Sequence, residues 1–315
     1  VTTAPPAAPD FDAIRSEVAA EPADAYLDKE TREIVPSVTG VDFDTAQAQA
    51  VLDAAGEGET VSVPLLLTEP KLTTAKLEAN LFKDVLGSGS TACAGPSNRW
   101  YNIDLAAKRL NGTILLPGET FSYNDTVGPY TLASGYKAAG TYQNGQSVDA
   151  TAGGICQLSS NLYWVTLKAN LEIVERTNHS YVSSYVPIGM DATVSWGGPE
   201  FKFKNNTDYP IKIVATYENN RQTFQILGTK VSDFTVEITT STLSVISPTV
   251  REVPDATLAA GTTVVEDNGH TGYKVQSYRH VYDGNGNLIS EGKEAYSSYR
   301  MTEKVVRVGT MVAPA

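Results

Sequence analysis

The sequence predicts an α+β protein in three consecutive parts: a small α+β domain, a mixed α+β domain with an antiparallel sheet, and an elongated all-β module. Three observations support this prediction. Apolar residues with helical spacing occur in the first two parts, β-branched and aromatic runs dominate the second half, and no helical period is left beyond residue 232. We place the boundaries as follows: a linker at 1–10, the first domain at 11–90, the second at 91–230 and the β module at 231–315.

The composition excludes several classes of function. The chain of 315 residues carries 24 Lys and Arg against 36 Asp and Glu, which gives a formal net charge of −12 at pH 7. This charge repels polyphosphates, so we expect no nucleic-acid partner and no polybasic membrane binding. No stretch approaches the roughly 18 consecutive apolar residues that cross a bilayer. Cys93 and Cys156 are the only cysteines, which excludes a disulfide scaffold.

The first ten residues are rich in Pro and Ala and lack both an initiator Met and a signal sequence. We expect this segment to be a spacer that joins the first domain to an upstream signal or single membrane anchor. The cysteine count neither favours nor excludes export.

The first domain shows both helical and strand patterns. We expect helices over 11–18 and 45–52, the second of them capped by Asp44. Short strands are expected at 25–28 and 61–67.

A segment rich in glycine and serine at 87–91 is expected to end the first domain. The second domain then begins with a helix that Asn98 caps. Short extended pieces follow at 113–116 and 121–124, and the glycines between 128 and 145 predict a loop-rich stretch.

A helix of about 14 residues is predicted from Ile155 onward by its apolar spacing, with Cys156 near its N-terminus. Strands of an antiparallel sheet are expected at 173–176, 182–186, 192–195, 201–204, 211–217 and 223–227. In the β module, residues 283–287 predict a hairpin turn. They lack the bidentate Glu and the flanking helices of an EF-hand calcium loop.

Cys156 has a clear route to covalent chemistry. Gly153 and Gly154 precede it at the start of the predicted helix, where unpaired N–H groups and the positive end of the helix dipole favour the thiolate. The same N–H groups can hold an oxyanion, and the glycines let a substrate backbone approach. Two alternatives stay open: a buried, inert thiol and a disulfide with Cys93.

A cysteine nucleophile needs a base, and the sequence offers three histidines. His270 and His280 fall in the β module. His179 follows the predicted helix and the strand that runs back from it, so the spacing allows it to return to Cys156. No zinc-ligand spacing, phosphate loop or Gly-x-Ser-x-Gly elbow is present, and we expect neither a metal nor a cofactor.

Several segments between about 98 and 228 resemble the VanW family. They are Asn102-Ile103, Ala106-Ala107, 110–113, 117–124, 154–159, Glu175-Arg176, His179-Ser180, 185–187, Gly189 and Asp191-Ala192. Residues 11–90 resemble the peptidoglycan-binding domain that often precedes VanW domains. The tail resembles the G-five domain, an extended β module of surface proteins, at Leu258, Gly261, Gly269, Gly272, Tyr278-Arg279, Gly286, Val306 and Gly309-Thr310.

The resemblance implies an extracellular protein of a Gram-positive bacterium, held at the cell wall or by a membrane anchor. The family takes its name from a vancomycin-resistance cluster, and some of its members are cysteine L,D-transpeptidases. Peptidoglycan stem peptides are then the expected partners, with cell-wall glycan as a candidate ligand of the C-terminal module. The sequence departs from the family pattern at Ala152, where glycine is usual, at Tyr130, where arginine is usual, and at Cys93, where an aromatic residue is common.

Carried over by this resemblance, Cys156 is the nucleophile and His179 the base. Asp191 or Asn178 is expected to orient His179, as the third member of such triads does. Arg176 is expected to bind a stem-peptide carboxylate, with a structural salt bridge as the equal alternative. Glu119 is a further carboxylate, for which a turn role is at least as good. The expected substrate-binding residues are Gly153, Gly154, Gln157, Arg176 and Ser180.

The expected reaction is acyl transfer through a thioester. His179 accepts the proton of Cys156, and the thiolate attacks the third residue of a tetrapeptide stem and expels D-Ala. An amine of a neighbouring stem then forms the cross-link. Hydrolysis by the same pair is one alternative, and a non-catalytic peptidoglycan-binding or adhesion protein is another. A Cys156 that solvent can reach, close to a ring nitrogen of His179, favours catalysis over binding.

Overall fold

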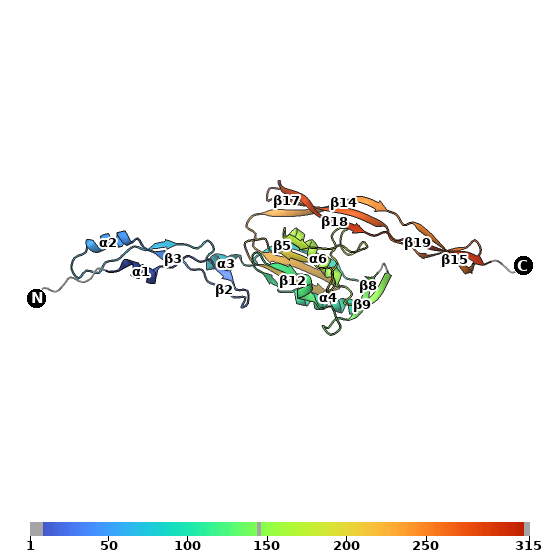
Figure 1. Cartoon of the computed structure of the whole chain (residues 1–315), viewed down its shortest axis with the longest axis horizontal. Coiled ribbons are helices and arrows are strands. Elements are labelled where there is room, and N and C mark those ends of the chain that lie inside the picture. Colours follow the sequence, from blue (N-terminus) through green and yellow to red (C-terminus); the bar gives the residue numbers. More distant parts are fainter. Residues whose placement is uncertain (1–8, 144–145, 312–315) are drawn as a thin grey trace. The chain divides into compact units, whose positions relative to one another are not determined.

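The computed structural model describes residues 9–143 and 146–311. The chain divides into two compact units, Val1–Leu81 and Phe82–Ala315 (Figure 1). In the described residues, helices and strands are mixed up to β13 (Arg221–Gly228) and strands alone follow it, so the predicted α+β class with an all-β C-terminal module is confirmed. No helix in the described ranges is both long and apolar enough to cross a bilayer.

From residue 9 onward, the described part of the first unit contains three short helices and two small antiparallel ladders. Its elements are α1 (Phe11–Val18), β1 (Tyr26–Leu27) paired with β2 (Ile34–Val35), β3 (Gly40–Asp42) paired with β4 (Leu66–Thr68), α2 (Thr45–Asp53) and α3 (Thr74–Asn80). Both predicted helices are confirmed, and the Asp44 carboxylate accepts the first amides of α2, as expected. The strand predicted at 61–67 is shorter, because β3 offers partners only to residues 66–68.

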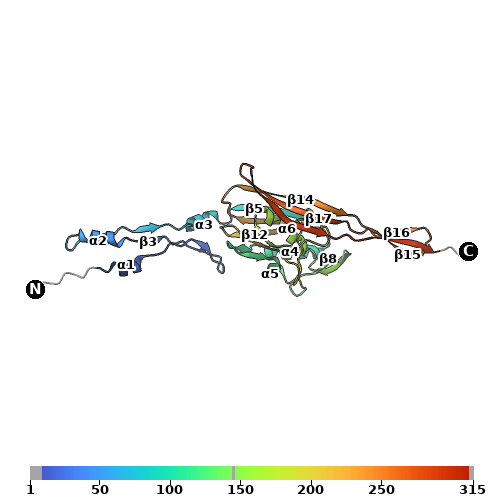
Figure 2. The ribbon, with the colours of Figure 1, turned by 45° about the horizontal axis from the view of Figure 1, so that its top comes forward.

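A four-stranded antiparallel sheet forms the centre of the second unit (Figure 2). Its order is β5 (Asp84–Ala92), β13 (Arg221–Gly228), β12 (Ile211–Glu218) and β6 (Ile114–Leu115). Helix α4 (Ser97–Leu110) packs on β12, and α6 (Ile155–Lys168) packs on β5 and β13. Fully buried side chains fill the core between them, among them Ile103, Leu110, Leu158, Leu162, Phe224 and Ile226. The helix predicted from Ile155 is therefore a central element of this core.

Two smaller sheets and a short helix complete the domain around α6. One sheet has the order β10 (Glu172–Glu175), β11 (Lys202–Lys204) and β7 (Thr120–Ser122), and the other pairs β8 (Ala138–Gln143) with β9 (Gln146–Thr151). Helix α5 (Tyr123–Val127) follows β7 directly. The buried rings of Phe121 and Phe203 lie 4.9 Å apart across β7 and β11.

The glycine-rich segment at 87–91 is not an irregular boundary but the middle of β5. A Cβ at Gly87 would lie 2.5 Å from the carbonyl oxygen of Val165, so α6 packs directly on the strand backbone. Close packing therefore requires the same small residues that are typical of a linker, and the sequence pattern could not distinguish the two.

Several other local predictions are wrong. Residues 182–186 and 192–195 are irregular rather than strands, and 123–124 start α5. The stretch from 128 to 145 is irregular up to residue 137, as predicted, and then forms β8, while Gly145 lies outside the described residues. The irregular segments bury apolar side chains such as Val186 and Val194, but their amides bond to loops and side chains instead of a ladder: Ala192 donates to Ser160 Oγ at 2.9 Å.

The start of α4 also differs from its prediction. The helix begins at Ser97 with Pro96 as its N-cap residue, and no side chain caps it. Asn98 instead donates its side-chain amide to the carbonyl of Ala138 at 2.9 Å, which ties α4 to β8.

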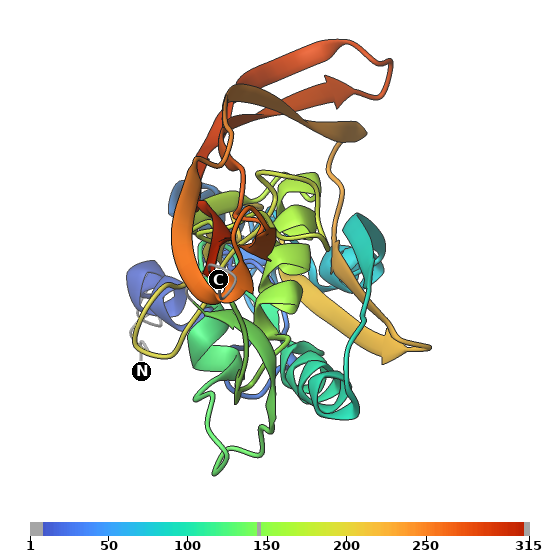
Figure 3. The same ribbon diagram turned by 90° about the vertical axis from the view of Figure 1, so that its right-hand side faces the viewer.

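The C-terminal module consists of two three-stranded sheets (Figure 3). The first has the order β14 (Phe234–Ile246), β17 (Gly272–Asp283) and β18 (Leu288–Tyr299), and the second has the order β15 (Val250–Ala259), β19 (Lys304–Met311) and β16 (Thr263–Asp267). The first sheet contacts α6 through β14. Residues 283–287 form the predicted hairpin turn, in which Asp283 accepts the amides of Asn285 and Asn287.

Candidate active site

The N-terminus of α6 holds Cys156 as the second residue of the helix. Its Sγ lies 3.4 Å from the carbonyl oxygen of Val194 and 3.8 Å from Thr193 Oγ1. The residue is half-buried and its thiol is free. Cys93 is free as well, so the alternative of a disulfide between the two is not seen.

The two glycines before Cys156 are needed because neighbouring parts of the protein pack directly against their backbone. A Cβ would lie 2.5 Å from the carbonyl oxygen of Ala139 at Gly153, and 2.9 Å from Ile103 Cγ1 at Gly154. Gly154 also has φ 110°, in the left-handed region that favours glycine. Strand β8 and helix α4 therefore fill the space that we expected a substrate backbone to use.

Replacing Gly153 by alanine is expected to destabilise the fold by about 1–3 kcal/mol, because the new methyl group overlaps a backbone carbonyl that has little freedom to move. Urea denaturation measures the loss. Gly292→Ala in β18 is the matched control, since nothing lies within 4 Å of the position, and its effect should stay within about 0.5 kcal/mol. Equal stability of the two variants would contradict this packing.

Asp191 fixes the orientation of His179. Its Oδ2 accepts hydrogen bonds from His179 Nδ1 at 2.7 Å and from the His179 amide at 2.6 Å. Only 1% of the Asp191 side chain is exposed, against 22% for His179. The other expected orienting residue, Asn178, donates to the carbonyls of His179 and Ser298 and not to the ring. With Nδ1 bound to Asp191, Nε2 is the nitrogen left for the thiol and for the Tyr185 hydroxyl, which lies 3.3 Å from it.

The electrostatics of the site favour a thiolate–imidazolium pair. Burial raises the pKa of the Cys156 thiol, but the hydrogen bond and charge of His179 outweigh it and hold the pKa below the ordinary 9.0. Burial lowers the pKa of His179, and its bonds to Asp191 and Cys156 more than compensate and raise it to about 9. A protonated His179 therefore favours the thiolate form of Cys156 at neutral pH.

This pair predicts the pH dependence of alkylation at Cys156. In a Cys93→Ser background, iodoacetamide should label Cys156 well below pH 9, because the thiolate is the reactive form. His179→Ala leaves the burial and removes the cation, so the midpoint of labelling should rise to or above the ordinary thiol value. An unchanged midpoint would contradict the pairing of Cys156 with His179.

Arg176 lies inside the fold and binds the protein rather than solvent. Only 4% of its side chain is exposed, and its guanidinium donates to Asp191 Oδ1 at 3.2 Å and to the Asp191 carbonyl at 2.6 Å. Further bonds reach Ser297 Oγ and the Gly189 carbonyl. Of the two alternatives left open for Arg176, the geometry matches the structural salt bridge.

Two other polar side chains expected at the site have internal roles. Gln157 is buried and donates to the carbonyl of Ala92 at 2.8 Å, so it ties α6 to the end of β5. Glu119 accepts the amide of Leu116 within a turn. Ser180 is exposed, and its carbonyl accepts the amide of Arg300 at 2.7 Å. Among the residues expected to bind substrate, Ser180 is thus the one with an exposed side chain.

The first turn of α6 narrows the choice of oxyanion donor. The amides of Ile155 and Gln157 already donate to the carbonyls of Ala152 and Gly154. Within the described residues, the Cys156 amide has no such partner. Among the N–H groups of Ile155, Cys156 and Gln157 at this helix start, the amide of Cys156 is thus the donor left to hold an oxyanion.

The positions that depart from the VanW pattern lie around this helix start. Ala152 has φ 65°, in the region that favours the usual glycine. Tyr130 donates its hydroxyl to the side-chain carbonyl of Asn124, and its ring meets Trp196 edge-on at 6.3 Å. Cys93 is buried, with its Sγ 3.5 Å from Gln157 Nε2. None of these three side chains replaces a member of the Cys156, His179 and Asp191 cluster.

The two other histidines, His270 and His280, lie in the C-terminal β module and have partners there. His270 contacts Thr302, and His280 contacts Thr239, each at 3.0 Å. Within residues 9–143 and 146–311, no group of three or more His, Cys, Asp and Glu side chains is arranged to hold a metal ion.

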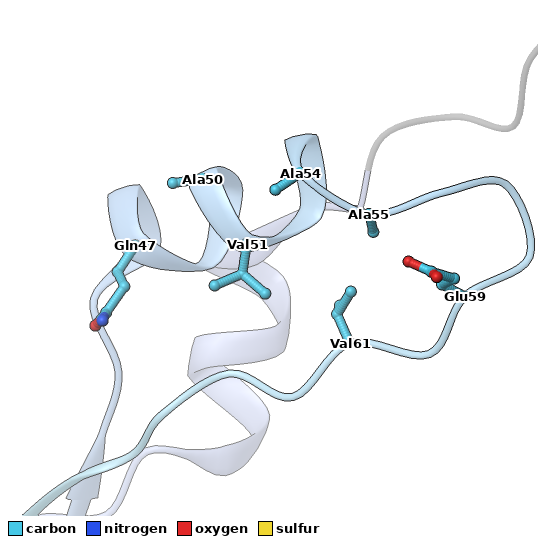
Figure 4. A pocket seen from close by; sticks show the side chains of 7 residues that line it. All are labelled: Gln47, Ala50, Val51, Ala54, Ala55, Glu59 and Val61. Atoms are coloured by element: carbon cyan, nitrogen blue, oxygen red, sulfur yellow. The ribbon is translucent and has the colours of Figure 1, made fainter.

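The first unit contains a hollow of about 420 Å³ between α2 and the segment that leads to β4 (Figure 4). Its lining is mainly aliphatic, with Val51, Ala54 and Val61 around one carboxylate, Glu59. It carries no nucleophile, and the chemistry described above lies in the other unit.

Comparison with protein-family models identifies two domains along the chain. A family model described as VanW like protein matches residues 98–227, and a G5 domain model matches residues 237–311. The chain contains a VanW-like domain followed by a G5 domain. Both resemblances read from the sequence are confirmed, whereas that of residues 11–90 to a peptidoglycan-binding domain stays a prediction. Cys156, His179 and Asp191 all lie in the VanW-like domain.

Two curated relatives share this domain. The chain is 40% identical over 162 residues to the uncharacterized protein YoaR of Bacillus subtilis, covering 51% of this chain and 53% of YoaR. It is 36% identical over 138 residues to the vancomycin B-type resistance protein VanW of Enterococcus faecalis, covering 42% of this chain and 50% of that protein. The chain thus spans about half the length of the relatives it matches.

Two of the solved structures similar to part of the chain are G5 domains. The G5 domain of IgA1 protease is 22% identical, covers 26% of this chain and 98% of its own, and has a TM-score of 0.19. The G5 domain of HP0197 is 19% identical, covers 25% of this chain and 100% of its own, and has a TM-score of 0.17.

Sequence reasoning missed several residues at the site. Tyr185 was noted only as part of a family segment, and Thr193 was not noted at all. Tyr299 donates its hydroxyl to Asp191 Oδ1 from the G5 domain, 108 positions further along the chain. No sequence signal distinguishes this tyrosine from the others on the strands.

Proposed function

We propose that this protein is a cell-wall-associated cysteine acyltransferase that acts on peptidoglycan stem peptides as an L,D-transpeptidase. The observation that carries the proposal is the cluster of Cys156, His179 and Asp191 at the start of α6, with its polarised thiol. The vancomycin-resistance protein among the relatives and the attached G5 domain support the cell wall as the place of action.

The first half of the reaction forms a thioester. The Cys156 thiolate attacks the carbonyl carbon of the third stem residue, and a C–S bond forms. The Cys156 amide donates to the resulting oxyanion. The C–N bond to D-Ala then breaks, and the His179 imidazolium gives its proton to the departing amine. Asp191 keeps the ring in place and stabilises its charge in the resting state.

The second half transfers the acyl group. An amine of a neighbouring stem attacks the thioester carbonyl, and neutral His179 accepts a proton from it. The C–S bond breaks, an amide cross-link forms, and the Cys156 thiolate and the His179 imidazolium are restored. If water attacks the thioester in place of the amine, the same residues catalyse hydrolysis and release a shortened stem.

We propose a division of labour along the chain, with the first boundary at Leu81 because β5 belongs to the second unit. In this division the first unit binds peptidoglycan, residues 82–230 catalyse, and residues 231–315 bind cell-wall glycan. In this arrangement the protein is extracellular and held at the wall, where stem peptides are accessible to it.

Product analysis tests the proposed activity. The native chain and a Cys156→Ala variant are incubated with muropeptides that carry tetrapeptide stems, and the products are identified by mass spectrometry. Cross-linked dimers and free D-Ala from the native chain alone support transfer. Tripeptide stems without dimers would replace transfer with hydrolysis. No product from a folded chain with a free Cys156 would overturn catalysis and favour a wall-binding protein.

A further inference from the structure

The end of β18 and the residue after it are joined by hydrogen bonds to the segment that carries His179 and Asp191. Each bond links the G5 domain to the VanW-like domain. The bonds run from the Tyr299 hydroxyl to Asp191 Oδ1, from the Gly189 amide to the Tyr299 hydroxyl, from Arg176 to Ser297 Oγ, from the Asn178 side chain to the Ser298 carbonyl, and from the Arg300 amide to the Ser180 carbonyl.

Burial and two hydrogen bonds hold the side chain of Tyr299 against Asp191. Only 3% of the residue is exposed, so solvent does not compete for its hydroxyl. The hydroxyl oxygen accepts the amide of Gly189 at 2.9 Å, and its single proton points to Asp191. Donor and acceptor are both satisfied, as a buried phenol requires.

The carboxylate of Asp191 is held from two sides. Oδ2 accepts both bonds from His179, and Oδ1 accepts those from Arg176 and Tyr299. Rotation of the carboxylate would break bonds at both oxygens at once. The groups that set the orientation of Asp191 are thus His179 and Arg176 from the VanW-like domain and Tyr299 from β18.

We propose that Tyr299 is a positioning residue of the active site, contributed by the G5 domain, which holds Asp191 so that His179 faces Cys156. The inference rests on the proposed function for its effect on turnover, but its effect on the thiol does not. The VanW-like domain therefore does not contain its whole active site, and strand β18 completes it. The G5 domain has this internal role in addition to any ligand it binds.

Tyr299→Phe in the full chain tests the proposal, because it removes the hydroxyl and keeps the ring. Without this donor the carboxylate of Asp191 is free to turn, and His179 pairs less well with Cys156. In a Cys93→Ser background, we expect the midpoint of Cys156 alkylation to rise by about one pH unit, which corresponds to the loss of one hydrogen bond to a charged group. Turnover of stem peptides should fall about 10-fold through kcat, with KM little changed.

Tyr296→Phe is the matched control. Tyr296 lies on the same strand, is 52% exposed, and pairs with Gln276 rather than with the site. This variant should keep the native midpoint. Ser297→Ala removes the hydrogen bond from Arg176 to the same strand. It should therefore raise the midpoint of Cys156 alkylation, as Tyr299→Phe does, but by a smaller amount.

The outcomes separate this inference from the proposed function. A native chain that does not turn over stem peptides, combined with a shifted midpoint in Tyr299→Phe, overturns the function and supports the positioning role. A Tyr299→Phe chain with the native midpoint and native kcat overturns the positioning role, whatever its change in stability. If Tyr299→Phe does not fold, Ser297→Ala takes its place in the test. A raised alkylation midpoint in Ser297→Ala then supports the positioning role of β18, and a native midpoint overturns it.

Discussion

Cys156→Ser is expected to lower the turnover of stem peptides by about 10⁴-fold or more. Serine keeps the size of the side chain, but its hydroxyl does not ionise near neutral pH, so the resting ion pair with His179 is lost. The imidazole then has no thiolate to raise its pKa, and it is no longer poised as the acid for the leaving amine. Initial rates of D-Ala release measure the effect.

Cys93→Ser is the control for this substitution. Cys93 is buried against Gln157 and takes no part in the proposed reaction. Its replacement should change stability at most and leave turnover near the native rate. Comparable rates for Cys156→Ser and the native chain would show that the sulfur of Cys156 is not the nucleophile.

Asp191→Asn is expected to affect both activity and stability. In asparagine, an NH2 group replaces one of the two carboxylate oxygens, and this group can donate hydrogen bonds but cannot accept them. The bonds that Asp191 now accepts from His179, Arg176 and Tyr299 therefore cannot all remain. Turnover should fall by about 10³–10⁴-fold, as for other triads that lose their carboxylate. The free energy of unfolding should fall by about 3–5 kcal/mol, because Arg176 stays buried without a counter-charge.

Glu175→Gln provides the comparison for stability. Glu175 pairs with Lys202 at 2.9 Å, but both side chains are substantially exposed, and such pairs contribute at most about 1 kcal/mol. Urea denaturation of the two variants should therefore give clearly different losses. An Asp191→Asn chain as stable as Glu175→Gln would contradict the buried network around Arg176.

The proposed pair of Cys156 and His179 could be predicted from the sequence because local patterns place both residues. Two glycines before an apolar helical period put Cys156 at a helix start, and α6 begins at Ile155 as predicted. One helix and one returning strand then bring His179 back to that end of the helix. The choice of Asp191 over Asn178 needed the structure, since both positions lie close to His179 along the chain.

The parts of the site that could not be predicted come from distant or irregular segments. Tyr299 and Ser297 lie in a module that looks separate in composition, and their polar atoms meet the site only through the packing of β18. Residues 192–195 alternate like a strand because Ala192 and Val194 are buried, but alternation reports burial and not backbone pairing. The amide of Ala192 bonds to Ser160 on α6, which replaces a ladder contact.

The fold was predicted well where side chains set the local structure and poorly where the backbone did. Asp44 caps α2 with its own carboxylate, a local interaction that the sequence shows directly. Gly87 lies in β5 because α6 approaches its backbone, a contact between elements far apart in the chain. A small residue has the same appearance in a linker and under a packed helix, so the sequence alone left that choice open.

The central claim is that Cys156 carries the acyl group of a stem peptide, and intact-mass spectrometry tests it most directly. The native chain and Cys156→Ala, both with Cys93 replaced by serine, are incubated with a tetrapeptide-stem muropeptide without an amine acceptor and quenched in acid. We expect the native chain to gain the mass of the muropeptide minus the mass of free D-Ala, because the thiol proton leaves with the amine, and Cys156→Ala to gain none. A folded native chain whose Cys156 alkylates readily but never gains this mass would contradict the account.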